Sequence, residues 1–160
     1  MNLKSILASA SIAVALSVVS GAAAPALEPD AVDVLAERNP DFAQGRRAVE
    51  ARDWDTAIKA FNAAAGRDAR NADIQNMLGY AYRNAGQLEA SLKHYQRALQ
   101  IDPRHRGVHE YIGEAYLMTG NPAKAEEHLA TLNKICPRVC EERDDLGKKI
   151  AAYRASNKQQ

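Results

Sequence analysis

Apolar residues recur along this chain with a long, fixed period. The segments 38–71, 72–105 and 106–139 align at an interval of 34 residues, with small and aromatic residues at matching positions. Within each segment the apolar positions lie three or four residues apart, which predicts amphipathic helices. A repeat of this length indicates helical units that bury their apolar faces only by stacking, so we predict an all-α solenoid.

Residues that begin and end helices divide each unit in two. Asn39-Pro40 and Asn121-Pro122 each place a capping residue before a proline that suits the first helical turn. The second helix of the first unit is expected to begin near Asp53-Trp54, and Asn71 is expected to cap the next unit. The other breaks are turn glycines and terminating prolines, namely Gly86, Gly120, Pro103 and Pro137.

Small and large side chains alternate at the matched interior positions. The first helices share a glycine, at Gly45, Gly79 and Gly113. The second helices share a bulky residue, at Phe61, Tyr95 and Leu129. We expect each glycine to let the second helix of its own unit approach closely, so that the two helices interdigitate.

This pattern resembles the tetratricopeptide repeat (TPR) family. The family pattern is Leu-Gly, an aromatic three residues later, a turn glycine, and then Ala, an aromatic, Ala and Pro. The middle unit follows it at Leu78, Gly79, Tyr82, Gly86, Ser91, Tyr95, Ala98 and Pro103, with Ser91 as the departure. The first unit is the most degenerate, since Arg52 replaces its turn glycine. The resemblance implies a right-handed solenoid of three helix-turn-helix repeats that binds other proteins.

The N-terminal segment 1–26 has the features of a signal peptide. Lys4 precedes the apolar run Ile6–Val19, and small residues permit cleavage after Ala26 or, as the alternative, after Ala22. A membrane anchor is the other interpretation, but the run of 14 residues is shorter than the ~20 that span a bilayer. We therefore expect an exported protein without membrane insertion after cleavage, with the periplasm favoured over secretion.

The regions that flank the repeats are short. The lead-in segment 27–37 is expected to form one or two helical turns. Segment 140–156 carries an apolar stripe of Leu146, Ile150 and Tyr153 on an otherwise polar helix, which predicts a capping helix over the end of the solenoid. Residues 157–160 are expected to be a disordered tail.

Two cysteines are the clearest candidate for chemistry. Cys136 and Cys140 lie on either side of Pro137 and join the last repeat to the capping helix. In an oxidising compartment this spacing favours a structural disulfide. Reduced buried thiols are one alternative, and a redox or metal role is another.

Other reactive side chains favour structural interpretations. His105 and His109 could present two metal ligands from one helical face, but Gly107 lies between them and no third ligand completes a set. His94 and His128 share a repeat offset, so a structural role is preferred. Because no catalytic motif stands out, we expect no enzyme activity and no cofactor. A net charge of +1 without a basic block argues against a nucleic-acid partner.

The groove of the solenoid is the candidate binding site. In the TPR family, first-helix residues line it at fixed offsets. The corresponding residues are Phe42, Arg46, Val49, Glu50, Asp73, Asn76, Tyr80, Arg83, Asn84, Glu110, Glu114, Leu117 and Met118. This mixed set suits an extended peptide or a helix, with a merely solvated face as the alternative. The family's basic clamp for a C-terminal carboxylate is disfavoured, because only Arg46 matches it.

We therefore predict a protein-interaction scaffold or assembly factor of the cell envelope. One alternative is a redox or cytochrome-maturation helper that uses Cys136 and Cys140. The other is an oligomeric structural protein, since the sequence leaves the oligomeric state open.

Overall fold

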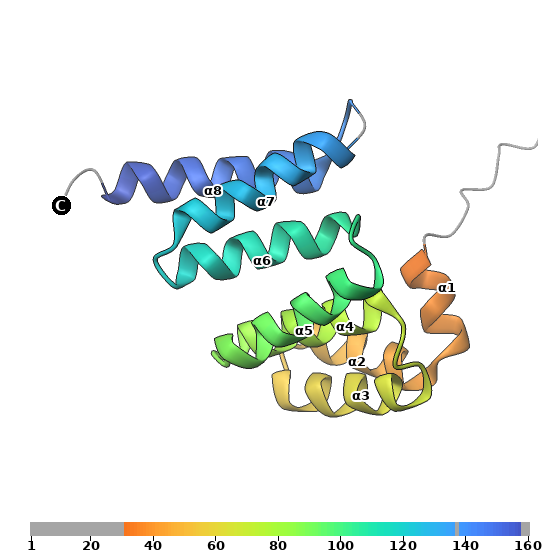
Figure 1. Cartoon of the computed structure of the whole chain (residues 1–160). Helices are drawn as coiled ribbons and strands as arrows, with labels where there is room; N and C mark the ends of the chain where they lie inside the picture. Colours follow the sequence, from red (N-terminus) through yellow and green to blue (C-terminus); the bar gives the residue numbers. More distant parts are fainter. Residues whose placement is uncertain (1–30, 137, 158–160) are drawn as a thin grey trace, which may run out of the picture.

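The computed structural model describes residues 31–136 and 138–157, which form eight α-helices and no strand (Figure 1). The segment 1–26 that we predict to be a signal peptide, the start of the lead-in and residues 158–160 lie outside the described residues. The helices are α1 (Ala31–Arg38), α2 (Pro40–Glu50), α3 (Trp54–Arg67), α4 (Ala72–Asn84), α5 (Leu88–Ile101), α6 (Arg106–Met118), α7 (Pro122–Ile135) and α8 (Glu141–Asn157).

The helices form three antiparallel hairpins, α2–α3, α4–α5 and α6–α7, that stack in chain order (Figure 1). Each second helix packs against the first helix of the next hairpin, and α8 packs against both helices of the last one. The all-α solenoid predicted from the period is confirmed. The lead-in ends in α1, a two-turn helix that packs on α2.

Side-chain caps begin most of these helices. The predicted caps Asn39, Asn71 and Asn121 each accept a hydrogen bond from the backbone N–H three residues later, at 3.0–3.2 Å. Asp53 caps α3 in the same way. His105 caps α6 through its ring Nδ1, 3.3 Å from the Val108 N–H. Each cap satisfies a backbone donor that the helix itself leaves free.

Two of the three matched glycines allow the predicted close approach. A Cβ atom on Gly45 would lie 2.4 Å from a ring carbon of Phe61, and one on Gly79 would lie 2.5 Å from the ring of Tyr95. The bulky residue of the second helix therefore packs directly on the glycine of the first helix, as predicted.

The third unit differs from this prediction. Gly113 faces Leu146 of α8, whose Cδ1 would lie 2.7 Å from an added Cβ, and does not face Leu129. Leu129 is shorter than the aromatic residues at its offset, and α8 packs on both α6 and α7. The capping helix thus supplies the side chain that the repeat itself lacks.

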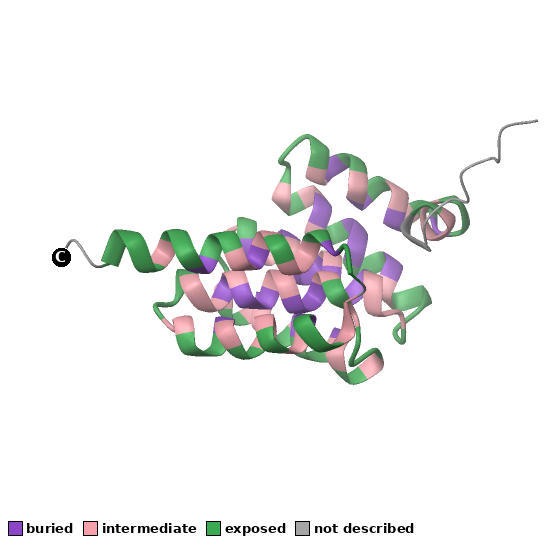
Figure 2. Ribbon diagram, turned by 90° about the horizontal axis from the view of Figure 1, so that it is seen from above, coloured by how far each residue is buried: buried purple, intermediate pink, exposed green. Residues whose placement is uncertain are grey.

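The last helix is mostly polar and buries a short apolar face against the last hairpin. Leu146 and Ile150 are buried, whereas exposed residues dominate its C-terminal half (Figure 2). Asn157, which we expected in a disordered tail, is the final residue of α8, where its side chain donates to the Tyr153 carbonyl. Gly147 and Leu146 stand 34 residues after Gly113 and Ile112, so α8 continues the repeat as a single first helix.

The core is divided along the solenoid. Separate clusters of buried side chains lie within the first hairpin and α4, around α5 and α6, and between α7 and α8. None of the described helices is both long and apolar enough to cross a bilayer.

Candidate functional site

An aromatic row runs across the first helices of the second and third hairpins. The Tyr80 ring of α4 lies 5.2 Å from the Tyr111 ring of α6 and 6.2 Å from the Trp54 ring at the start of α3, centroid to centroid. All three side chains are half-buried, so each keeps an exposed edge. We call this surface, together with Asn76, Arg83, Glu110 and Glu114, the first-helix groove.

Arg83 is fixed within this groove. Its guanidinium carbon lies 5.4 Å from the Tyr80 ring centroid and 5.3 Å from that of Tyr111, which is cation–π geometry. The same side chain is only 8% exposed and forms an ion pair with Glu114. Substituting Arg83 would leave Glu114 half-buried without this partner, so Arg83 is a poor probe of binding alone.

The groove acids are also paired with the capping helix. Lys149 of α8 pairs with Glu114 and lies 3.4 Å from Glu110. Burial raises the pKa of Glu110 to about 7; the Lys149 charge opposes this rise and the Glu114 charge adds to it. Burial alone would lower the pKa of Lys149, but the hydrogen bond to Glu114 and the charges of Glu114 and Glu110 raise it.

A cleft of about 430 Å³ opens between α4, α6 and α8. The cleft is lined in part by the groove residues Asn76, Glu110 and Tyr111. Gly107 also lines it and adds no side chain to its wall. Asn76 is 7% exposed, and its Oδ1 has no hydrogen-bond partner among the described residues.

The structure thus brings together five of the seven residues predicted as the main groove contacts: Asn76, Tyr80, Arg83, Glu110 and Glu114. The prediction for Phe42 is wrong. Its side chain is completely buried and packs 5.4 Å from the Phe61 ring, because α1 covers α2 and draws Phe42 into the core. Arg46 pairs with Asp33 of α1 at 2.6 Å, so it lies in the first unit rather than with the others.

Three groove residues escaped the sequence analysis: Trp54, Tyr111 and Lys149. Trp54 begins a second helix, and the family offsets considered only first helices. Tyr111 lies on a first helix, but it is not at one of the family offsets that line the groove. For Lys149 a signal did exist, since the 34-residue step from Gly113 to Gly147 aligns α8 with the first helices.

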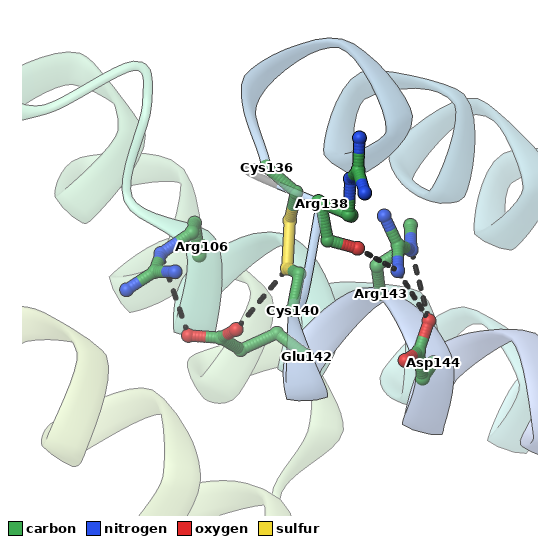
Figure 3. The surroundings of a disulfide bond; sticks show 7 residues. All are labelled: Arg106, Cys136, Arg138, Cys140, Glu142, Arg143 and Asp144. Carbon is green, nitrogen blue, oxygen red and sulfur yellow. Dashed lines mark hydrogen bonds and ion pairs between the residues drawn. A yellow bond between two sulfur atoms is a disulfide. The ribbon is translucent and has the colours of Figure 1, made fainter.

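Cys136 and Cys140 form a disulfide with a Cα–Cα distance of 5.8 Å, as the sequence favoured (Figure 3). The Cys140 Sγ lies 3.3 Å from a carboxylate oxygen of Glu142, and Arg106 of α6 lies 3.5 Å from the other. Arg143 donates to the Arg138 carbonyl at 3.2 Å. These contacts anchor the start of α8 to α6 and to its own linker.

The histidines are held by different partners. His105 bonds to Asp73 at 3.0 Å, whereas His109 lies 2.9 Å from His128 and 3.1 Å from the Pro103 carbonyl. The two side chains are therefore held by different partners and do not converge as a His105–His109 metal site would require. His94 and His128 stack on Tyr82 and Tyr116, which gives their shared offset a structural role.

Two family models of the tetratricopeptide repeat match the sequence, over residues 42–106 and 84–137. The chain belongs to the tetratricopeptide repeat family. The two matches together reach from α2 to the end of α7, which are the hairpins of this TPR solenoid. No curated protein matches the TPR chain significantly by sequence.

Solved TPR structures share its fold. The Yersinia enterocolitica type III secretion translocator chaperone SycD has a TM-score of 0.66 and 17% identity, over 81% of this chain and 90% of SycD. PcrH, in complex with the chaperone binding region of PopD, has a TM-score of 0.65 and 22% identity, over 82% of this chain and 99% of PcrH. The first TPR of Spaghetti (RPAP3), bound to the HSP90 peptide SRMEEVD, has a TM-score of 0.62 and 17% identity, over 78% and 95% of the two chains.

Proposed function

We propose that this TPR protein is a scaffold or assembly factor of the cell envelope, and that it holds a segment of another protein in its first-helix groove. The observation that carries the proposal is the fixed row of Trp54, Tyr80 and Tyr111, with Arg83 held against two of the rings. Rigid, half-buried aromatics beside a pre-positioned arginine are the side chains that dominate protein interfaces.

Two of the fold neighbours support a protein partner. PcrH is in complex with a region of PopD, and the RPAP3 repeat domain is bound to an HSP90 peptide. The present groove differs chemically from a basic clamp, because Glu114 pairs with both Arg83 and Lys149 and Glu110 lies beside Lys149. We therefore propose a partner segment that combines apolar residues with polar ones.

The setting in the cell envelope rests on two features. The segment 1–26 has the organisation of a signal peptide. The Cys136–Cys140 disulfide suits an oxidising compartment such as the periplasm, where such bonds persist. Both features support export.

Peptide selection followed by one substitution tests the binding surface. A random peptide library displayed on phage is selected on the protein, and the affinities of the selected peptides are measured for the wild type and for Tyr80→Ala. Tyr153→Ala is the matched control, since Tyr153 is also half-buried but lies on α8 next to Gly120. We expect Tyr80→Ala to weaken binding about tenfold or more. Equal binding by Tyr80→Ala and the wild type would place the site elsewhere.

A further inference from the structure

The aromatic row of the first-helix groove carries three hydrogen-bond donors that have no acceptor in the described part of the chain. They are the indole N–H of Trp54 and the phenol O–H groups of Tyr80 and Tyr111. None of these three atoms belongs to the unpartnered polar atoms that are fully buried. Each donor therefore reaches the surface of the groove, where a ligand can accept a hydrogen bond from it.

The row crosses the helices of the solenoid. Trp54 begins α3, Tyr80 lies on α4 and Tyr111 lies on α6. Successive rings lie 6.2 Å and 5.2 Å apart, centroid to centroid, and their planes are inclined by 67° and 50°. Rings inclined in this way do not form one flat surface, so rigid apolar groups of a ligand can pack between their exposed edges.

The charged groups beside the row are paired with one another. Arg83 lies against both tyrosine rings and pairs with Glu114. Lys149 also pairs with Glu114 and lies 3.4 Å from Glu110. A charged side chain of a partner has to compete with these pairs, whereas a neutral segment leaves them in place. The groove therefore favours a partner whose contacting residues are uncharged.

The free donors distinguish between the backbone conformations that a partner can bring. A helix satisfies its own carbonyl groups, so it would cover the three donors without supplying acceptors, which is unfavourable. An added β-strand needs a sheet edge, and the described residues form no strand. A polyproline II segment has no internal hydrogen bonds, so its carbonyl groups remain available, and its prolines have no N–H to leave unpaired.

The dimensions of the row also fit the polyproline II conformation. This helix rises about 3.1 Å per residue, so about two residues separate neighbouring rings of the row. Grooves lined by aromatic side chains are a recurrent binding surface for proline-rich segments. Because such segments already populate the bound conformation, their binding loses little conformational entropy.

We propose that the first-helix groove binds a proline-rich segment of its partner in the polyproline II conformation. The proline rings pack against Trp54, Tyr80 and Tyr111, and carbonyl groups of the segment accept hydrogen bonds from the three donors. The proposal rests on the proposed function and adds the chemistry of the partner. Polar residues of the segment then flank the prolines instead of interrupting them.

The fluorescence of Trp54 gives a direct readout, because it is the only tryptophan in the chain. A neutral oligoproline peptide without aromatic residues is titrated into the protein. A neutral amphipathic helical peptide of leucine, alanine and glutamine is the control. We expect the oligoproline to shift the Trp54 emission saturably and the helical peptide to leave it unchanged at the same concentrations. Peptides selected from the phage-displayed library should be enriched in proline.

Removing one phenol group at a time tests the proposed hydrogen bonds while each ring stays in place. We expect Tyr80→Phe and Tyr111→Phe each to weaken oligoproline binding about threefold to tenfold, the range for one neutral hydrogen bond. Tyr153→Phe is the matched control and should bind as the wild type does, since Tyr153 is also half-buried but lies on α8. Both groove substitutions keep the aromatic packing on Arg83, so we expect the fold to be retained.

Three results would overturn the proline-rich partner. The first is no response of Trp54 to oligoproline while selected peptides without proline depend on Tyr80, which leaves the proposed function standing. The second is a Trp54 response to the helical peptide at lower concentrations than to oligoproline, which assigns a helical partner to the same groove. The third is oligoproline binding that neither phenylalanine substitution weakens. If no selected peptide depends on Tyr80, the proposed function itself fails.

Discussion

Arg52 adopts a backbone conformation that glycine adopts in the other two repeats. Its φ is 56°, against 78° for Gly86 and 72° for Gly120, and all three residues lie in the turn between the helices of a hairpin. The left-handed conformation is unfavourable for a residue with a Cβ atom. The first repeat therefore keeps the same turn conformation as the other two repeats, although this conformation is energetically unfavourable at Arg52.

Replacing Arg52 by glycine should stabilise the protein. We expect Arg52→Gly to raise the free energy of unfolding by roughly 0.5–1 kcal/mol, because relief of strain exceeds the added freedom of the unfolded chain. Gly86→Ala is the matched control, since nothing lies within 4 Å of the added Cβ and only the φ strain remains. It should lower stability by a similar amount in urea denaturation. No gain from Arg52→Gly would mean that the turn is unstrained.

His128 makes the fold sensitive to acid. Burial, and secondarily the charge of His109, lower the pKa of His128 from 6.5 to about 4. The unfolded chain then binds this proton more readily, so the stability contributed by the neutral ring is present above pH 6.5 and is lost as the pH falls towards 4. Glu110 acts in the opposite sense, because its raised pKa stabilises the fold as the pH falls from 7 towards 4.5.

The difference in the free energy of unfolding between the wild type and His128→Gln isolates the contribution of this histidine to the pH dependence of stability. We expect the wild type to lose about 1–2 kcal/mol more than the variant between pH 7 and pH 4.5, after discounting for partial exposure. Urea denaturation of the two proteins across this pH range measures both free energies of unfolding. Parallel stability profiles would show that His128 titrates normally in the fold.

Among the helices, glycine contacts set the spacing within a hairpin. Gly79→Ala places a Cβ 2.5 Å from the Tyr95 ring, so we expect a loss of about 1–3 kcal/mol in the free energy of unfolding. Gly66→Ala on α3 meets nothing within 4 Å and should instead stabilise the protein by about 0.5–1 kcal/mol. Thermal unfolding of the two variants gives the comparison. If both changes were tolerated alike, the close approach at Gly79 would be incorrect.

The disulfide fixes the linker between α7 and α8. Cys136→Ser with Cys140→Ser should lower the free energy of unfolding by about 2 kcal/mol, the loop-entropy value for so short a loop. Hydrogen exchange should quicken in α8 and leave α4 and α5 unchanged, because only the cap loses its anchor. A reductant should reproduce this effect in the wild type and have none in the variant. Free thiols in the isolated protein would contradict the bond itself.

At the scale of the whole molecule, the repeats could be predicted and the groove only in part. Periodic positions such as Gly79 and Tyr95 contact each other within one hairpin, so the sequence itself specifies their packing. The burial of Phe42 depends on packing by α1, and the ion pairing of Glu114 depends on Lys149 of α8. The α1 helix has no counterpart in the repeat pattern, and α8 continues that pattern only as an unpaired first helix. The family offsets within the three repeats therefore misplace Phe42 and omit Lys149.

The groove and the opposite face of the solenoid offer matched positions for a direct comparison. Asn84 is exposed at the end of α4, one turn beyond Tyr80, and Gln96 is exposed on the second helix α5. A photo-crosslinking amino acid at either position leaves the buried contacts of Tyr80 and Arg83 in place.

Photo-crosslinking in producing cells from these two positions tests most directly whether a partner binds in the first-helix groove. We expect a protein segment to be crosslinked from Asn84 and not from Gln96, and we expect Tyr80→Ala to reduce the yield of that adduct. An adduct from Gln96 alone, or equal yields from both positions, would contradict binding in the first-helix groove.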